Sequence, residues 1–226
     1  MSEHAAVAAH PHPHVSQLAA LHHFRIYVDI GVVVVVLAMT NLLAHFTTPW
    51  ANVAVVPAAA VGLLMLVRSR GLGWAELGLG REHWKSGALY ALGAVLLVLT
   101  VIAVGALLPW TRPMFFLNNH YATLSGALLA SMIIIPLQTV IPEELAFRGV
   151  LHGALDRAWG GFRGGVAAAG SLLFGLWHVA TSLGLTSSNV GFTRLFGGGG
   201  FLGMLAGGVV MAVLATGAAG FVFTWL

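Results

Sequence analysis

The run SGALYALGAVLLVLTVIAVGALL, residues 86–108, contains no charged side chain and is apolar over almost its whole length. A helix of about 20 apolar residues crosses the ~30 Å hydrocarbon core of a lipid bilayer. This run is therefore long enough to cross a membrane as a single helix. This run decides the fold class, because a chain with one membrane-spanning helix must be searched for further spans of the same length.

The overall composition supports the same interpretation. Hydrophobic residues make up 58% of the 226 residues and charged residues only 8%, against about 25% charged residues in an average soluble domain. Five further apolar runs lie near residues 26–46, 51–67, 123–142, 165–182 and 200–226. We predict an all-α fold, a polytopic transmembrane helical bundle of about six spans that covers residues 25–226 and makes the chain a multi-pass integral membrane protein.

The positions of the basic residues predict the orientation of this bundle. One set of loops and the segment before the first span carry Arg25, Arg68, Arg70, Arg81, Lys85, Arg148, Arg157 and Arg163, whereas the opposite loops carry Arg112 and Arg194. Short cytoplasmic loops retain Lys and Arg, so the N-terminus is expected in the cytoplasm. The net charge of +3 is explained by topology. No basic face of the kind that binds nucleic acid is visible, and no nucleic-acid partner is expected.

The first 24 residues form a segment rich in histidine: His4, His10, His12, His14, His22 and His23. Such tracts can bind a divalent metal ion. Pro11 and Pro13 interrupt any helix that would bring the imidazoles together, so a disordered cytoplasmic tail is the favoured interpretation. The chain contains no cysteine, which excludes a disulfide framework and a thiol nucleophile.

Two charged features near the membrane surface receive structural interpretations. Asp29 lies about one turn inside the first span, four residues after Arg25, and this spacing predicts an ion pair. Residues 71–85 alternate Trp and Leu with charged residues, as in an interfacial segment with aromatic anchors. Glu76 and Glu82 in this segment can be solvated, so neither is a catalytic candidate.

The carboxylates of Glu143 and Glu144 are different, because ionisable side chains at bilayer depth are rare and mark functional sites. Pro142 either kinks the fourth span or begins a new helical segment whose first turn holds both glutamates. At helical spacing Glu144 faces Arg148, while Glu143 points toward the side of Phe147. Glu144 thus has an expected partner. Glu143 has none, and it is the candidate general base toward water.

The fifth span adds Phe174 and His178, which lie four residues apart and so on one helix face. A lone histidine on an apolar helix is usually structural, but a second helix with two glutamates and Arg148 favours a joint active site. The chain lacks the HExxH, G-x-S-x-G and G-x-x-x-x-G-K-[ST] motifs of other enzyme classes. Activation of water by Glu and His, with or without a metal, is the remaining chemistry.

These residues resemble the CAAX protease and bacteriocin-processing (CPBP) intramembrane proteases. The first motif of that family, E-E-x-x-x-R, is matched by Glu143, Glu144 and Arg148, and the second, F-x-x-x-H, by Phe174 and His178; Trp177 beside the histidine is similar too. The resemblance covers roughly residues 85–226. It implies an intramembrane endopeptidase of the plasma (inner) membrane of a bacterium, acting on membrane-associated peptides or proteins.

The resemblance also implies roles for these residues. Glu143 and His178 would activate the attacking water, Glu144 and Arg148 would support them through their ion pair, and Phe147 and Phe174 would pack the site. The family has been described both as metalloproteases and as glutamate-dependent proteases. A divalent metal such as zinc on Glu143 and His178 is therefore one expectation, although a zinc site typically needs three protein ligands and water.

One departure from the family bears on activity. Members usually carry a third motif on the next helix, a histidine followed four residues later by Asn or Asp, and this chain has no histidine after His178. Truncation before that helix is the favoured explanation and a degenerate, inactive member the other. The alternative function is a non-catalytic membrane protein, either a bacteriocin immunity or interaction factor or a carrier of protons or a ligand. Substrate identity and oligomeric state are not encoded in any visible pattern.

Overall fold

The structure is a computed structural model that describes residues 13–111, 124–183, 193 and 197–225. The described residues are helical or in turns and contain no strand, which confirms the all-α prediction. Of the predicted N-terminal tail, residues 1–12 lie outside the described part. The remainder of it is already helical, because α1 begins at Pro13.

Five helices are long and apolar enough to cross a membrane, over His23–Phe46, Trp84–Leu107, Ala130–Trp159, Arg163–Ser182 and Gly200–Thr224. A sixth apolar helix, Val53–Ser69, is shorter. The main elements are α1 (Pro13–Phe46), α2 (Pro49–Ser69), α3 (Trp84–Leu107), α8 (Arg163–Ser182) and α11 (Gly200–Trp225). The expectation of about six apolar helices therefore holds, with the second too short to satisfy the same criterion as the others.

The helix that carries the glutamates is longer than the predicted span 123–142. It runs without a break from Leu124 to Trp159 through α5 (Leu124–Leu129), α6 (Ile141–Glu144) and α7 (His152–Trp159), joined by the π-helical turns η3 (Ala130–Ile134), η4 (Pro136–Val140) and η5 (Leu145–Leu151). We refer to it as the long helix. Single π-helical turns inside α-helices are often found at functional sites.

Pro142 does not begin a new helix, contrary to one of the two expectations. Val140 before it and Leu145 after it both have right-handed helical φ and ψ. Neighbouring helices and local π adjustments can satisfy the backbone groups that a proline leaves free inside a membrane protein. Glu143 and Glu144 consequently lie in the middle of the long helix. Arg148, expected in a loop between two spans, lies inside the same helix instead.

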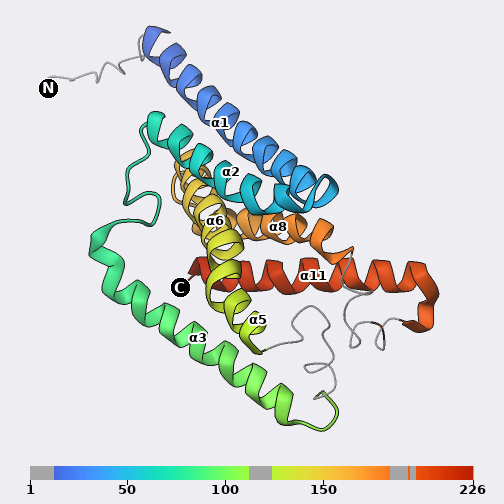
Figure 1. Cartoon of the computed structure of the whole chain (residues 1–226). Coiled ribbons are helices and arrows are strands. Elements are labelled where there is room, and N and C mark those ends of the chain that lie inside the picture. The colour runs from blue at the N-terminus through green and yellow to red at the C-terminus, as the bar shows by residue number, and fades with distance from the viewer. Residues whose placement is uncertain (1–12, 112–123, 184–192, 194–196, 226) are drawn as a thin grey trace, which may run out of the picture.

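The core forms where the long helix passes between the other elements. It contacts α1, α2 and α8, while α8 packs along α11; Figure 1 shows these helices grouped together. Val150, Leu151 and Val166 are completely buried in this core, and Phe147 is nearly so. In contrast, α3 has no buried residue and lies apart from α1, α2 and α8 in Figure 1.

The connection from α2 to α3 is fastened to the long helix at one end of the bundle. Leu77 is buried, and the Arg157 guanidinium donates hydrogen bonds of 2.7 and 3.2 Å to the Glu76 carboxylate. The same guanidinium donates to the backbone carbonyls of Arg70 and Gly71. The expected interfacial segment therefore packs against the bundle through Leu77, and Glu76 is half-exposed and ion-paired.

Candidate functional site

Glu143 has a partner that sequence spacing did not reveal. The indole Nε1 of Trp177 on α8 donates a 2.7 Å hydrogen bond to Glu143 Oε1. The prediction that Glu143 lacks a partner is therefore wrong: the long helix and α8 cross at this point and supply one. Because the indole is a donor only, this bond holds one carboxylate oxygen and leaves Oε2 for other chemistry.

His178 follows Trp177 directly and is partly buried. Its Nδ1 lies 2.9 Å from the Phe174 backbone carbonyl oxygen. A carbonyl can only accept, so Nδ1 carries the proton and the lone pair of neutral His178 is on Nε2. The neighbouring Trp177 side chain holds the Glu143 carboxylate on the same helix crossing. The structure thus brings these two side chains, predicted to act together, to the same place.

The ion pair expected from the spacing of Glu144 and Arg148 is present, with 3.2 Å between Nη1 and Oε1. The Glu144 side chain is 46% exposed and that of Arg148 only 17%. The guanidinium also stacks over the Phe174 ring, with Cζ 3.8 Å from its centroid. Although Nη1 is close enough for the ion pair, neither it nor Nη2 is aligned for a hydrogen bond within the described part of the chain. The charge is therefore held by Coulombic and cation–π attraction.

Three aromatic rings join these polar groups. Phe147 lies edge-to-face with Phe174 at a centroid distance of 5.2 Å and with Trp177 at 5.5 Å, and the Phe174 ring meets His178 in the same way at 4.7 Å. Such pairs contribute about 0.5–1.5 kcal/mol each beyond area burial. The expected packing role of Phe147 and Phe174 matches this arrangement, because the two rings connect the helices that carry Glu143 and His178.

Glycines allow α11 to approach the site closely. A Cβ at Gly220 would lie 3.2 Å from both Arg148 Nη2 and Phe174 Cδ1, and one at Gly175 would lie 2.7 Å from the Val213 carbonyl oxygen. Small residues at helix interfaces permit such contacts in membrane proteins. α11 therefore covers the Arg148 side of the site, while α1 and α2 lie on the Glu143 side.

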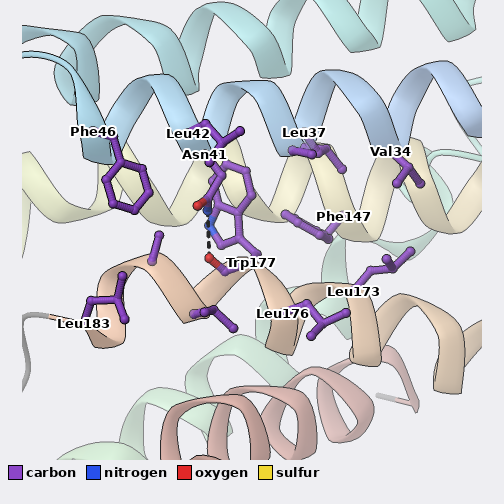
Figure 2. A pocket seen from close by; sticks show the side chains of 13 residues that line it. Val34, Leu37, Asn41, Leu42, Phe46, Phe147, Leu173, Leu176, Trp177 and Leu183 are labelled. Atoms are coloured by element: carbon purple, nitrogen blue, oxygen red, sulfur yellow. Dashed lines mark hydrogen bonds between the residues drawn. The ribbon is translucent and has the colours of Figure 1, made fainter. Parts of the chain in front are cut away.

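An apolar cavity of about 510 Å³ lies between α1 and α8 beside the site. Figure 2 shows Phe147 and Trp177 on its wall, with Leu37 and Leu42 of α1 across from α8. The same two aromatic residues also line the small space that contains Glu143. Phe147 and Trp177, together with Leu37 of α1, line both spaces and so lie between the cavity and the carboxylate.

Asn41 is the polar member of the cavity wall. Its Nδ2 donates a 2.7 Å hydrogen bond to the Trp177 backbone carbonyl, drawn in Figure 2. One turn further along α1, His45 lies 3.1 Å from Thr181 on α8. α1 is thereby attached to the residue that holds Glu143. Nothing in the sequence motifs marked Asn41 or His45 as neighbours of the site.

The donor set fits a zinc site poorly. Among the described residues no three His, Cys, Asp or Glu side chains come together, whereas zinc sites typically take three or four protein ligands. Glu143 Oε1 and His178 Nδ1 are already hydrogen-bonded, which leaves Oε2 and Nε2. We therefore derive no catalytic step through a metal ion.

Comparison with known proteins addresses the family directly. No curated protein and no solved structure gives a significant match to the chain. The family model described as type II CAAX prenyl endopeptidase Rce1-like matches residues 125–226. This segment contains Glu143, Glu144, Arg148, Phe174 and His178, and the match confirms over these residues the similarity to the CPBP family, the Rce1-like CAAX proteases.

Proposed function

We propose that the protein is an intramembrane endopeptidase of the CAAX-protease type that hydrolyses peptide bonds with a water molecule activated by Glu143 and His178. The observation that carries the proposal is the Glu143 carboxylate, fixed by a hydrogen bond from Trp177, the residue directly before His178 on α8. Ionisable groups at membrane depth are costly unless they serve a function. A purely structural role would not need a carboxylate and an imidazole at one helix crossing.

The arrangement suits general acid–base catalysis. Glu143 Oε2 accepts a proton from water while the water oxygen attacks the peptide carbonyl carbon. The protonated Glu143 then donates this proton to the amide nitrogen as the C–N bond breaks. His178 Nε2, which carries the lone pair, accepts a hydrogen bond from the second O–H of the same water and so orients it. Arg148 keeps positive charge beside the site and is itself held by Glu144 and Phe174.

The cavity between α1 and α8 supports a membrane-associated peptide or protein as the substrate. Its lining is almost entirely apolar, and it meets the catalytic residues at Phe147 and Trp177. An apolar segment next to the scissile bond would replace lipid in this space. The distribution of basic residues between the loops favours an N-terminus in the cytoplasm. We propose the plasma membrane of a bacterium as the location of the protein.

Cleavage of labelled membrane peptides by the full chain in proteoliposomes tests the proposal. Glu143→Gln keeps the shape and the bond from Trp177 but removes the base, so we expect a loss of about 10²–10⁴-fold in kcat. His178→Ala is expected to lose activity to a similar extent. Glu82→Gln, which changes a surface glutamate outside the site, is the matched control and should leave the rate unchanged.

Equal activity in wild type, Glu143→Gln and His178→Ala would overturn the enzymatic proposal and favour a non-catalytic membrane protein. Metal content should be measured in the same samples after removal of residues 1–24, since the histidines of that segment can bind metal themselves. Stoichiometric zinc that disappears in His178→Ala would place a metal on this pair.

A further inference from the structure

A second polar cavity lies away from the proposed active site, where the first two helices meet the end of the long helix. It has a volume of about 270 Å³ and is lined by Arg25, Asp29, Arg70 and Arg157. One water molecule occupies about 30 Å³ in the liquid. The cavity therefore has room for a polyatomic ion or headgroup rather than for one or two waters only.

Its position corresponds to the boundary of the membrane. Arg25 lies at the beginning of the span His23–Phe46, Arg157 near the end of the span Ala130–Trp159, and Arg70 directly after α2. Nearby, the Arg68 guanidinium lies 4.4 Å from the Trp74 ring centroid. Trp and Arg side chains of this kind mark the headgroup level of the bilayer. The cavity is thus placed where phospholipid phosphates lie.

The charges of the lining are unbalanced. Three guanidinium groups face one carboxylate, Asp29, whose Oδ1 is 3.3 Å from Arg70 Nε. This contact also corrects the predicted pairing of Asp29 with Arg25, since α2 returns beside α1 and brings Arg70 closer. Arg157 is paired with Glu76, which lies outside the lining. Arg25 makes no ion pair within the described part of the chain, so its positive charge remains uncompensated.

The donors of the three arginines are used to different degrees. Arg157 is committed to Glu76 and to two backbone carbonyls. Arg70 uses only Nε, which leaves its two terminal nitrogens, and its side chain is 51% exposed. Arg25 is exposed as well. Arg25 and Arg70 can therefore present guanidinium forks to an anion, while Arg157 is held by Glu76.

We propose that this cavity binds the phosphate group of an anion, supplied by the headgroup of an anionic phospholipid or by free phosphate. Guanidinium groups match phosphate oxygens in bidentate geometry, and basic pockets between membrane helices bind anionic headgroups. The bound phosphate would contact α1 and the end of α2, next to the end of the long helix. The proposal is independent of the proteolytic function.

Binding to the full chain in a neutral detergent tests it. The probes are phosphatidylglycerol, phosphatidylcholine with the same acyl chains, and inorganic phosphate, with bound lipid counted by native mass spectrometry and phosphate followed by calorimetry. We expect phosphatidylglycerol to bind in preference to phosphatidylcholine. Saturable binding of inorganic phosphate would identify the free ion as sufficient, whereas binding of phosphatidylglycerol alone would identify the headgroup.

Three variants locate the site. Arg25→Gln should weaken binding of the anionic probe by about tenfold or more, the usual loss for a charge-assisted contact. Asp29→Asn should strengthen it by about threefold or more, because it removes the only negative group of the lining. Arg163→Gln is the matched control: Arg163 begins α8 at the same end of the bundle, is exposed, and does not line the cavity.

The proposal is overturned if phosphatidylglycerol and phosphatidylcholine bind equally and phosphate does not bind. It is also overturned if Arg25→Gln and Arg163→Gln have the same effect, since the attraction would then come from general surface charge. A stronger affinity in Asp29→Asn is the result that a merely structural role of these residues would not produce.

Discussion

Two membrane-spanning regions of this protein, α3 and the long helix, reverse the usual relation between hydrophobicity and burial. α3 has a mean hydropathy of 2.5 over its most apolar stretch and none of that stretch is buried, whereas the corresponding stretch of Ala130–Trp159 has a mean hydropathy of only 1.3 and is 22% buried. In a soluble protein the more apolar helix would occupy the interior. Here the less apolar helix does.

The difference follows from the solvent. Lipid tails are as apolar as leucine, so burial of an apolar side chain between helices gains little, and helices associate through close packing, small residues and polar contacts. α3 has no buried residue, and its leucines and valines are exposed. The long helix and α8 meet all of them, with glycines, aromatic pairs, an ion pair and the hydrogen bond from Trp177 to Glu143. Identical substitutions in the two regions should therefore have unequal effects.

The largest difference is expected for glycine to alanine. In Gly175→Ala the new Cβ would lie 2.7 Å from the Val213 carbonyl oxygen, so α8 and α11 must separate, at a cost of about 1–3 kcal/mol. Gly93→Ala on α3 meets nothing within 4 Å and should be neutral or stabilise the helix by up to about 1 kcal/mol. Unfolding of both variants in mixed micelles measures the pair. Equal stability would mean that α8 and α11 do not pack as described.

The second largest difference between the two regions is expected in the rate of peptide cleavage when a tryptophan is replaced by phenylalanine. Trp177→Phe keeps an aromatic ring against Phe147 but removes the hydrogen bond to Glu143, so kcat for peptide cleavage should fall about tenfold or more. Trp84→Phe changes an exposed residue at the beginning of α3 and should alter kcat less than about twofold. If Trp177→Phe retained full activity, the indole would not position the carboxylate.

A smaller effect is expected from filling the apolar cavity. Ala180 lines it, so Ala180→Phe should compete with the apolar part of the substrate and raise KM by about threefold, while kcat changes less. Ala91→Phe adds the same ring to an exposed position of α3 and should leave KM unchanged. A fall in kcat with constant KM would instead indicate that the larger side chain disturbs Trp177.

The smallest effect concerns the connection between these two regions. The Gly73 backbone N–H, followed by the Arg157 guanidinium, holds the pKa of Glu76 below its ordinary value of 4.5. The resulting stabilisation is fully present above pH 4.5 and is lost as the pH falls through the lower pKa of the folded protein. Because Glu76 is half-exposed, less than about 1 kcal/mol is expected.

Hydrogen exchange of residues 71–79, measured as a function of pH, reports on this contact. The protection factor, which is the intrinsic exchange rate at each pH divided by the observed rate, should fall on acidification below pH 4.5 in the wild type and should lose this dependence in Glu76→Gln. Glu82→Gln is the control, because Glu82 lies beyond this turn. The same fall in protection in Glu76→Gln would assign the effect to another acidic group.

The features predicted correctly from the sequence are those that local spacing determines. Long apolar runs predict the helices, and four-residue spacing predicts the pairs Glu144–Arg148 and Phe174–His178. The pairs Trp177–Glu143 and Arg70–Asp29 depend on how separate helices cross, and no periodicity encodes that. Of the two expectations for Pro142, a kink or the start of a new helix, the second is wrong: the long helix continues through the proline, with π-helical turns on both sides of it.

The hydrogen bond from Asn41 to the Trp177 carbonyl has a consequence for where the functional unit begins. Residues 125–226 carry the family match and both motifs, yet the wall opposite α8 and the donor to Trp177 belong to α1. A fragment made of the matched residues would have an open side at its catalytic helix crossing. The smallest piece of this chain that can be expected to keep the site intact therefore includes α1 and, since α2 fastens α1 to the long helix, both N-terminal helices.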